Sequence, residues 1–202
     1  MLILSVDTSM PILSVALYDD RVIGAIAMEG KESRNQKLLP AIDWLLTESA
    51  IDRRDLKVLA VTRGPGSFTG VRVALATVQG LAFALNVPTV GMSTHEAAAE
   101  DWAGDSVVLH SDAGRGEFYV SAFRDDEQVL EPVLMTAAAL AELKSQFPNA
   151  VDLGSLSEKN NIALLAAKRA SRLVTMNVAA KYADLTPIYV RLAEADVKLL
   201  RT

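Results

Sequence analysis

Residues 2–20 read LILSVDTSMPILSVALYDD, and residues 107–125 read VVLHSDAGRGEFYVSAFRD. Each stretch holds two runs of strand-forming residues, separated by a turn that an aspartate opens. The sequence therefore predicts two related lobes, one over residues 1–103 and a smaller one over residues 104–202. At an offset of 105 positions the two stretches share four residues: Leu4 with Leu109, Asp7 with Asp112, Val15 with Val120, and Asp20 with Asp125.

The rest of each half alternates between strand and helix patterns. Further strands are predicted at 22–28, 56–62 and 89–92, with helices at 36–50, 68–86 and 95–102. In the second half, a strand at 150–153 lies between helices at 136–147 and 160–172. We expect no capping box at Thr94, because Glu96 follows only two residues later. The alternation predicts an α/β protein with mixed sheets. Two duplicated, hairpin-led lobes resemble the plan of the actin-like (ASKHA, ribonuclease H-like) superfamily.

The composition narrows the possible functions. The 202 residues carry a formal net charge of −5, which argues against this chain alone holding nucleic acid by neutralising phosphates. There is no cysteine, so disulfides, thiolate metal sites and a cysteine nucleophile are excluded. The N-terminus begins directly as a strand, without the basic and apolar regions of a signal peptide. The longest uncharged stretch, 73–94, is interrupted by polar residues, glycine and proline. We therefore expect a cytosolic protein with no membrane span.

An aspartate ends the first strand of each predicted lobe. Asp7 and Asp112 sit at turn mouths, where a carboxylate can hold Mg²⁺ through water. The alternative is that each accepts hydrogen bonds from the backbone of its own turn, as aspartates in Asx-turns do. The second interpretation is favoured for Asp7, and the same two interpretations apply to Asp112.

A glycine-containing loop, 64–70, leads into the second long helix. Backbone N–H groups at a helix start can hold a phosphate, but no lysine follows the last glycine, so the P-loop pattern is not met. We favour a structural loop in which Ser67 or Thr69 caps the helix. The two histidines, His95 and His110, are fifteen residues apart and cannot form a His-x-x-x-His site. A hydrogen-bonded structural role is favoured for both.

The two long helices suggest a protein interface. On the first, Leu38, Leu39, Ile42, Leu45, Leu46 and Ser49 fill an arc of about 120°, which is one core-facing stripe. Trp44 falls outside that stripe, and exposed aromatics are frequent in partner contacts. The second helix has no polar face at all, so it is either fully internal or covered by a partner. We favour a partner, which the small residues Ala74, Ala76, Gly80 and Ala84 would allow to approach closely.

Several motifs together resemble the bacterial TsaB (YeaZ) family. The most specific is RGPGSFTGVR at 63–72, and the resemblance extends over nearly the whole chain, although the C-terminal end is shorter than is typical of the family. The other motifs are ILSVDTS at 3–9, LLP at 38–40, QGLA at 79–82, GMST at 91–94, DAGRGEFY at 112–119 and PIYVR at 187–191.

This resemblance implies an actin-like fold and a role in making N6-threonylcarbamoyladenosine at position 37 of tRNAs that read codons beginning with A. In that family TsaB is the inactive relative of the catalytic subunit TsaD, with which it pairs through the first two helices, and an ATPase subunit, TsaE, joins them. The catalytic relative carries a His-x-x-x-His pair where this chain reads KESRNQK at 31–37. Its nucleotide loop is represented here, if at all, by Gly154 and its two neighbours.

The resemblance therefore implies a subunit without catalytic residues and without a resident metal. It implies no tightly bound cofactor, with ATP or ADP and Mg²⁺ held mainly by the partner subunits. It also implies that tRNA is reached only through the complex. Because the apolar flank of the second helix would be exposed without a partner, we expect the isolated chain to be a homodimer through the two long helices. Asp7, Asp112 and Gly154 would remain as vestiges of an interlobe nucleotide site; a small actin-like ATPase or kinase using the two aspartates is the alternative. The expected interface residues are Leu39, Asp43, Trp44, Leu46, Phe68, Thr69, Arg72, Val73, Ala76, Gly80, Phe83 and Ala84.

Overall fold

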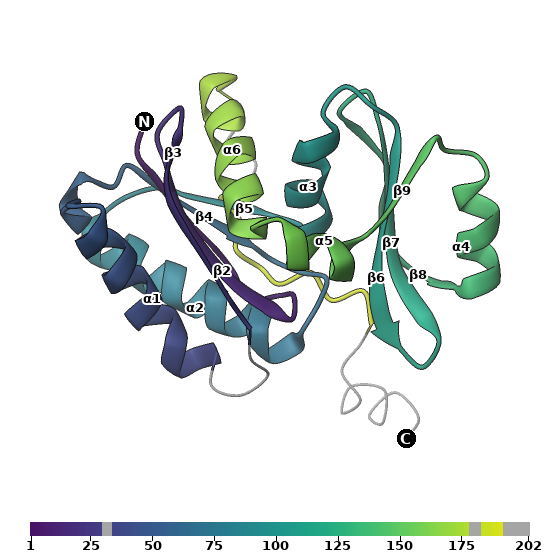
Figure 1. The fold of residues 1–202 in the computed structure, drawn as a ribbon, viewed down its shortest axis with the longest axis horizontal. Coiled ribbons are helices and arrows are strands. Elements are labelled where there is room, and N and C mark those ends of the chain that lie inside the picture. Colours follow the sequence, from purple (N-terminus) through teal and green to yellow (C-terminus); the bar gives the residue numbers. More distant parts are fainter. Residues whose placement is uncertain (30–33, 178–182, 192–202) are drawn as a thin grey trace.

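The first half of the chain builds a five-stranded mixed sheet (Figure 1). A computed structural model describes residues 1–29, 34–177 and 183–191. The strand order is β3-β2-β1-β4-β5, with β1 and β2 antiparallel and β1, β4 and β5 parallel. Runs of valine, leucine and isoleucine form the buried central strands. The strands are β1 (Ile3–Asp7), β2 (Ile12–Tyr18), β3 (Val22–Glu29), β4 (Val58–Thr62) and β5 (Thr89–Met92).

The second half repeats this plan with one strand fewer. Its sheet has the order β8-β7-β6-β9, again with an antiparallel hairpin and a parallel neighbour on the other side. The predicted duplication of a hairpin-led α/β lobe is therefore confirmed. Asp20 and Asp125 share a left-handed backbone conformation at equivalent turns, with φ of 52° and 49°. The strands are β6 (Val107–Gly114), β7 (Glu117–Arg124), β8 (Glu127–Thr136) and β9 (Asn149–Asp152).

The two hairpins differ in register by one residue. In the first lobe Ile3 pairs with Tyr18, whereas in the second lobe it is Val107, not Val108, that pairs with Phe123. A shift of one residue changes which side chains face each other across the pair, because side chains alternate between the faces of a strand. The repeat in the sequence therefore does not extend to equivalent cross-strand neighbours.

Helices form layers outside and between the sheets (Figure 1). Helices α1 and α2 cover the outer face of the first sheet and α4 covers the outer face of the second, while α3, α5 and α6 lie between the sheets. Ser67 caps the start of α2, and Asn86, in a left-handed conformation, ends it. The helices are α1 (Arg34–Glu48), α2 (Phe68–Leu85), α3 (Thr94–Ala98), α4 (Ala137–Lys144), α5 (Leu153–Lys159) and α6 (Ile162–Thr175).

Helix α6 joins the two halves into one core. It comes from the C-terminal part of the chain but packs against β1, β2 and β4 of the first sheet. One hydrophobic cluster accordingly contains Ile3 and Ala60 from the first lobe together with Leu109, Phe123 and Ala166 from the second half. The division at residues 103 and 104 stays a prediction, and across it the two lobes share buried side chains.

Several boundaries differ from the prediction for identifiable reasons. The capping box that we did not expect is present, because Ser93 rather than Thr94 is the cap: the Ser93 hydroxyl accepts from Glu96 N, and the Glu96 carboxylate accepts from Ser93 N. The predicted helix at 95–102 is a short α-helix followed by a 3-10 turn, η2 (Ala99–Trp102). The strand predicted at 56–62 begins only at Val58, a second 3-10 turn, η1 (Arg53–Asp55), precedes it, and α5 was not predicted.

Candidate functional site

A cavity of about 350 Å³ opens between the two lobes, where the carboxyl ends of β1 and β6 face each other. The cavity contains two of the three residues that we predicted between the lobes, Asp112 and Gly154, whereas Asp7 does not line it. Its lining residues are Ser9, Met10, Pro11, Gly66, Ser67, Ser111, Asp112, Ala113, Tyr119, Asp152 and Gly154.

Asp7 is fully buried behind this cavity and accepts hydrogen bonds from the residues around it. Its Oδ1 accepts hydrogen bonds from Ser9 N at 3.1 Å, from the Ser9 hydroxyl, and from the Thr62 hydroxyl at the end of β4. Burial raises the pKa of the Asp7 carboxyl, because desolvation penalises the charged form, and Oδ2 has no hydrogen-bond partner. The geometry therefore supports the Asx-turn interpretation, in which Asp7 joins the ends of two neighbouring strands.

The surroundings of Asp7 also fix the loop before α2. The Ser9 carbonyl accepts from Ser67 N at 2.8 Å, and the Ser9 and Thr94 hydroxyls are 2.8 Å apart. Gly66 has a φ of +156°, and a Cβ at this position would overlap the Ser9 carbonyl. Glycine is therefore needed here for close approach of two backbones rather than for approach of a phosphate.

The chemistry of the interlobe cavity does not fit a nucleotide phosphate. Among the described residues, its charged lining groups are the carboxylates of Asp112 and Asp152, and no lysine or arginine lines it. Both carboxylates already accept from their own turns, Asp112 from Gly114 N at 2.7 Å and Asp152 from Gly154 N at 3.1 Å. In the described parts of the chain, no group of three or more His, Cys, Asp and Glu side chains is placed to hold a metal ion. The Mg²⁺-nucleotide that the fold family implies is therefore poorly matched by these residues.

Both histidines are buried, His95 between the lobes and His110 on the face of the second sheet that α4 covers. The His95 Nδ1 lies 2.7 Å from the Ser121 hydroxyl, and burial lowers the pKa of His95 to about 3, so the ring is neutral near pH 7. Burial likewise lowers the pKa of His110, whose ring meets Phe118 edge-on at 5.9 Å between centroids. These contacts agree with the structural role that we favoured from the sequence.

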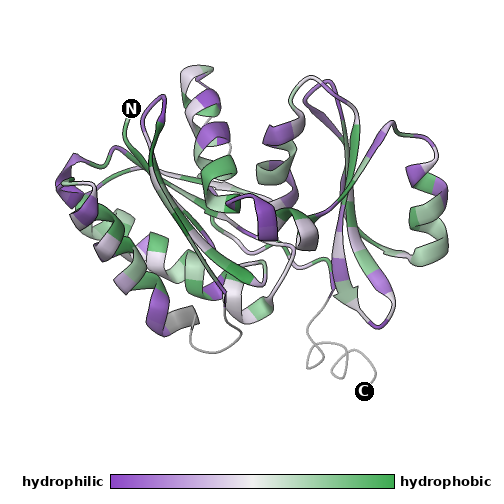
Figure 2. Ribbon diagram, viewed as in Figure 1, coloured by the Kyte–Doolittle hydropathy of each residue, from purple (hydrophilic) through white to green (hydrophobic). Residues whose placement is uncertain are grey.

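The outward faces of α1 and α2 leave large apolar side chains in water. The exposed fraction is 57% for Trp44, 49% for Leu39 and 91% for Phe83. Figure 2 shows α2 in apolar or neutral colours over most of its length. We call these exposed residues the outer face: Leu39, Asp43, Trp44, Phe68, Thr69, Arg72, Ala76, Gly80, Phe83 and Ala84.

Three residues that we assigned to the contact with a partner are covered, wholly or in part, by this chain itself. Leu46 is only 6% exposed and packs in the first-lobe core, in line with its place in the predicted core-facing stripe of α1. Leu39, in the same predicted stripe, is instead 49% exposed. Ala74 is fully buried, so it does not set the approach of another helix, and Val73 is half-buried.

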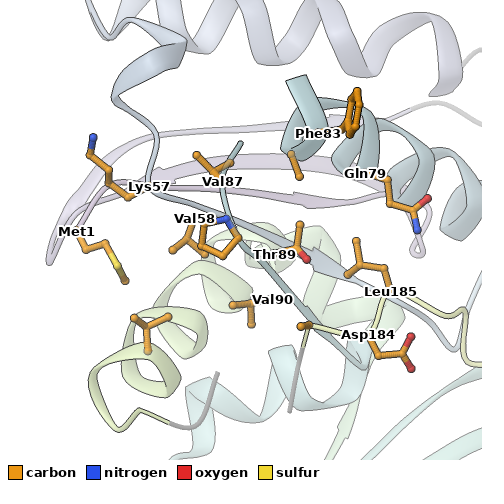
Figure 3. Close-up of a pocket in the computed structure, with 14 residues that line it drawn as sticks. Met1, Lys57, Val58, Gln79, Phe83, Val87, Thr89, Val90, Asp184 and Leu185 are labelled. Atoms are coloured by element: carbon orange, nitrogen blue, oxygen red, sulfur yellow. The ribbon is translucent and has the colours of Figure 1, made fainter. Parts of the chain in front are cut away.

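Two apolar pockets adjoin the outer face, and no pattern in the sequence predicts either of them. One, of about 480 Å³, lies beside Trp44 and is lined by Ile26 and Met28 of β3 and by Pro40 and Ala41 of α1, among others. The larger pocket, of about 800 Å³, lies along the edge strand β5 and below Phe83 (Figure 3). Its few polar side chains, among them Lys57, Gln79 and Asp184, are not grouped for catalysis.

Helix α2 also bears on the membrane prediction. By length and composition alone its 18 residues are sufficient to cross a membrane, which corrects our statement that this stretch is too broken. The helix is continuous because Gly80 is tolerated in its interior. Gly70, Val71, Ala74, Leu75 and Val78 are buried against the rest of the protein.

Comparison with known proteins gives a consistent family. The family model described as TsaD, tRNA N6-adenosine threonylcarbamoyltransferase, matches residues 27–185. The Bacillus subtilis tRNA threonylcarbamoyladenosine biosynthesis protein TsaB is 30% identical over all of this chain and 99% of that protein. The Escherichia coli TsaB protein is 37% identical over 131 residues, which is 63% of this chain and 57% of that protein. The structure of YeaZ from Pseudomonas aeruginosa superposes with a TM-score of 0.73 at 22% identity, over 93% of this chain and 99% of that one.

The family model covers most of the chain, and the Bacillus subtilis alignment runs from end to end. The fold of YeaZ agrees with the two duplicated lobes described above. Each of these findings confirms the resemblance that the motifs at 3–9 and 63–72 indicate. The chain therefore belongs to the TsaD family of actin-like proteins, among its TsaB (YeaZ) members.

Proposed function

We propose that this chain is a non-catalytic subunit in tRNA threonylcarbamoyladenosine biosynthesis, the process for which its relatives are named. It pairs through the outer face with a TsaD-like catalytic subunit, which transfers the threonylcarbamoyl group to adenosine 37 of tRNA. A TsaE-like ATPase joins the pair, and ATP or ADP and Mg²⁺ are held by the partner subunits. The chain acts in the cytoplasm and meets tRNA only through the complex.

One observation carries the proposal: an apolar helix surface with nothing over it among the described residues. Phe83 is 91% exposed and Trp44 57% exposed. Burying one large apolar side chain contributes about 1.5–3 kcal/mol, so a partner that covers this face gains a substantial driving force. Ala76, Gly80 and Ala84 follow one another along exposed α2 and allow a second helix to approach closely. Large aromatics beside small residues are typical of the centre of a protein interface.

The absence of catalytic function is supported by the cavity chemistry. Among the described residues, the interlobe lining has carboxylates but no lysine or arginine, so a triphosphate would meet repulsion there. Residues 31–33, part of the region that would carry the histidine pair of a catalytic relative, lie outside the described residues; the sequence there contains no histidine. The alternative, an actin-like ATPase using Asp7 and Asp112, predicts tight Mg-ATP binding. Calorimetric titration of the purified chain should instead give weak binding or none.

The central experiment is co-purification of the chain with its TsaD-like subunit. Ala76→Glu places a charge in the middle of the outer face, and an unpaired charge buried in an interface costs several kcal/mol. We expect the wild-type pair to elute together and the Ala76→Glu pair to elute separately. The matched control is Ala141→Glu, at an exposed alanine of α4 on the other lobe, which should leave the complex intact. If both variants still co-elute, the interface lies elsewhere.

The outer face also predicts self-association of this chain. In the absence of a partner, a second copy related by a two-fold axis is the simplest cover for an exposed apolar helix. We therefore expect light scattering to find a homodimer for the wild type and for Ala141→Glu, and a folded monomer for Ala76→Glu. A monomeric wild type would remove this part of the proposal without affecting the heterodimer.

A further inference from the structure

Residues 183–191 form an extended segment that we call the strap, drawn in yellow in Figure 1. It begins along the edge strand of the first lobe, where Asp184 and Leu185 lie near Thr89 and Val90 (Figure 3). A Cβ at Gly91 would stand 2.6 Å from the Leu185 side chain and 2.8 Å from the Asp184 carbonyl. Glycine at position 91 therefore lets the strap lie directly on the sheet edge.

The middle of the strap is held by Arg63, at the end of β4. The Arg63 Nη1 donates to the Thr186 carbonyl at 3.1 Å and lies 3.4 Å from the Asp184 carboxylate. The Arg63 backbone carbonyl accepts from Ile188 N at 2.8 Å. The Arg63 side chain is only 18% exposed, so these contacts are largely shielded from water.

Tyr189 then anchors the strap to the beginning of α2. Its hydroxyl accepts from Arg72 Nε at 2.8 Å, and its ring lies 5.1 Å from the Phe68 ring, centroid to centroid. The Arg72 guanidinium lies 3.7 Å from the centre of the Phe68 ring, which is a close cation–π contact. The three side chains therefore form one stacked cluster at the start of the helix.

Two residues later the strap reaches the second lobe. The Arg191 guanidinium donates to the Ala113 carbonyl at 2.9 Å and pairs with the Glu117 carboxylate, on either side of the β6–β7 turn. Ala113 lines the interlobe cavity, as do Gly66 and Ser67 immediately before α2. The strap therefore connects the two walls of the cavity, from the start of α2 to the β6–β7 turn.

A second tie between the lobes lies away from the cavity. Arg172 of α6 donates to Glu100 at 2.8 Å and to Asp126 of the β7–β8 turn at 3.3 Å. Asp126 and the β6–β7 turn are at opposite ends of β7, so the two ties hold the second sheet at opposite ends. Loss of the strap tie would leave the second sheet held at the β7–β8 turn. The β6–β7 turn could then move away from the first lobe, which would open the cavity.

We propose that the strap sets the angle between the lobes and couples the start of α2 to the β6–β7 turn. This inference concerns the isolated chain and is independent of the proposed partner. Tyr189 and Arg191 are positioning residues near the C-terminal end of the strap: Tyr189 holds it to the first lobe and Arg191 holds it to the second, and loosening either contact loosens the other. Two contacts carry the proposal: the ion pair of Arg191 with Glu117 in the second lobe, and the hydrogen bond from Arg72 to Tyr189 in the first.

The first test measures the interlobe distance. Because the chain has no cysteine, Arg21→Cys and Glu142→Cys give one spin label on each lobe at exposed positions. Labelled chains diluted with unlabelled wild type report distances within one molecule, measured by pulsed electron resonance. We expect Arg191→Gln to broaden the distance distribution and shift it. Arg54→Gln, which breaks a surface pair with Asp52 that does not include the strap, is the matched control and should leave the distance distribution unchanged.

The second test measures coupling by hydrogen exchange. Arg191→Gln should speed exchange at Ile188 in the first lobe by about fivefold or more, the size expected from a charge-assisted hydrogen bond that is partly exposed to water. Tyr189→Phe keeps the ring and removes only the hydroxyl that accepts from Arg72. It should speed exchange at the β6–β7 turn, on the other lobe. A wild-type distance distribution in folded Arg191→Gln, or unchanged exchange at that turn in Tyr189→Phe, overturns the proposal. If Arg191→Gln does not fold, the Tyr189→Phe result alone decides.

Discussion

At the scale of single residues, two buried titratable groups make stability depend on pH in opposite directions. His95 has its pKa lowered to about 3, and the unfolded chain would titrate near 6.5. Below about pH 6.5 the unfolded state binds the proton more readily, so stability is lost as the pH falls toward 3. The expected slope is about 1.4 kcal/mol per pH unit in that window.

His95→Asn should remove this slope, because asparagine keeps a polar atom near Ser121 but does not titrate. Urea unfolding at pH 7, 6 and 5 would measure the free energy of unfolding, which should change less with pH in the variant than in the wild type. Parallel curves would show that the ring of His95 is accessible to protons in the folded state.

The buried carboxyl of Asp7 makes stability depend on pH with the opposite sign. Its folded pKa is raised, so its contribution to stability is complete below the unfolded value of 3.8 and is lost as the pH rises through the folded value. The difference in unfolding free energy between wild type and Asp7→Asn should therefore shift in favour of the mutant as the pH rises, by up to about 1.4 kcal/mol per pH unit. Asp7→Ala should share this pH dependence and should be less stable than Asp7→Asn by about 1–3 kcal/mol, because the Ser9 and Thr62 hydroxyls lose their acceptor. Urea titrations of both variants measure this, and a constant offset for Asp7→Asn would contradict it.

At the scale of elements, the start of α3 depends on one serine. Ser93 and Glu96 satisfy each other's backbone N–H groups, and Ser93 is 1% exposed. Ser93→Ala should therefore cost about 0.5–2 kcal/mol of stability. Ser155→Ala, within α5 and exposed, is a control expected to cost much less. Thermal unfolding of both variants measures the difference, and equal melting temperatures would show that water replaces the cap.

The sequence predicts elements better than their contacts. Alternating apolar runs and the repeated aspartate revealed both hairpins, because these signals are local. Leu46 falls in the predicted core-facing stripe and is buried, whereas Leu39 of the same stripe is exposed and Ala74, which we expected to face a partner, is buried. Whether each is covered, however, depends on the neighbouring helix and sheet, which a helical wheel does not contain. The capping box was missed because the helix begins one residue earlier than the pattern suggested.

At the scale of the whole molecule, the family and fold followed from dispersed motifs, and the candidate site followed only in part. The exposure of Phe83 and Trp44 agrees with the apolar pattern of the two helices. The links between distant residues could not be foreseen: Arg191 with Glu117, and Tyr189 with Arg72. Such pairs depend on how the lobes are placed, and no periodicity within either segment encodes that placement.

The position of α6 has a consequence for how the protein is made. The first sheet is assembled from residues 3–92, yet its inner face is covered by a helix that the ribosome synthesises only at residues 162–175. Until that helix has left the exit tunnel, the apolar inner side of β1 and β4 lacks one of the helices that cover it in the folded protein. We therefore expect part of this face of the nascent N-terminal lobe to stay exposed through the translation of the whole second sheet.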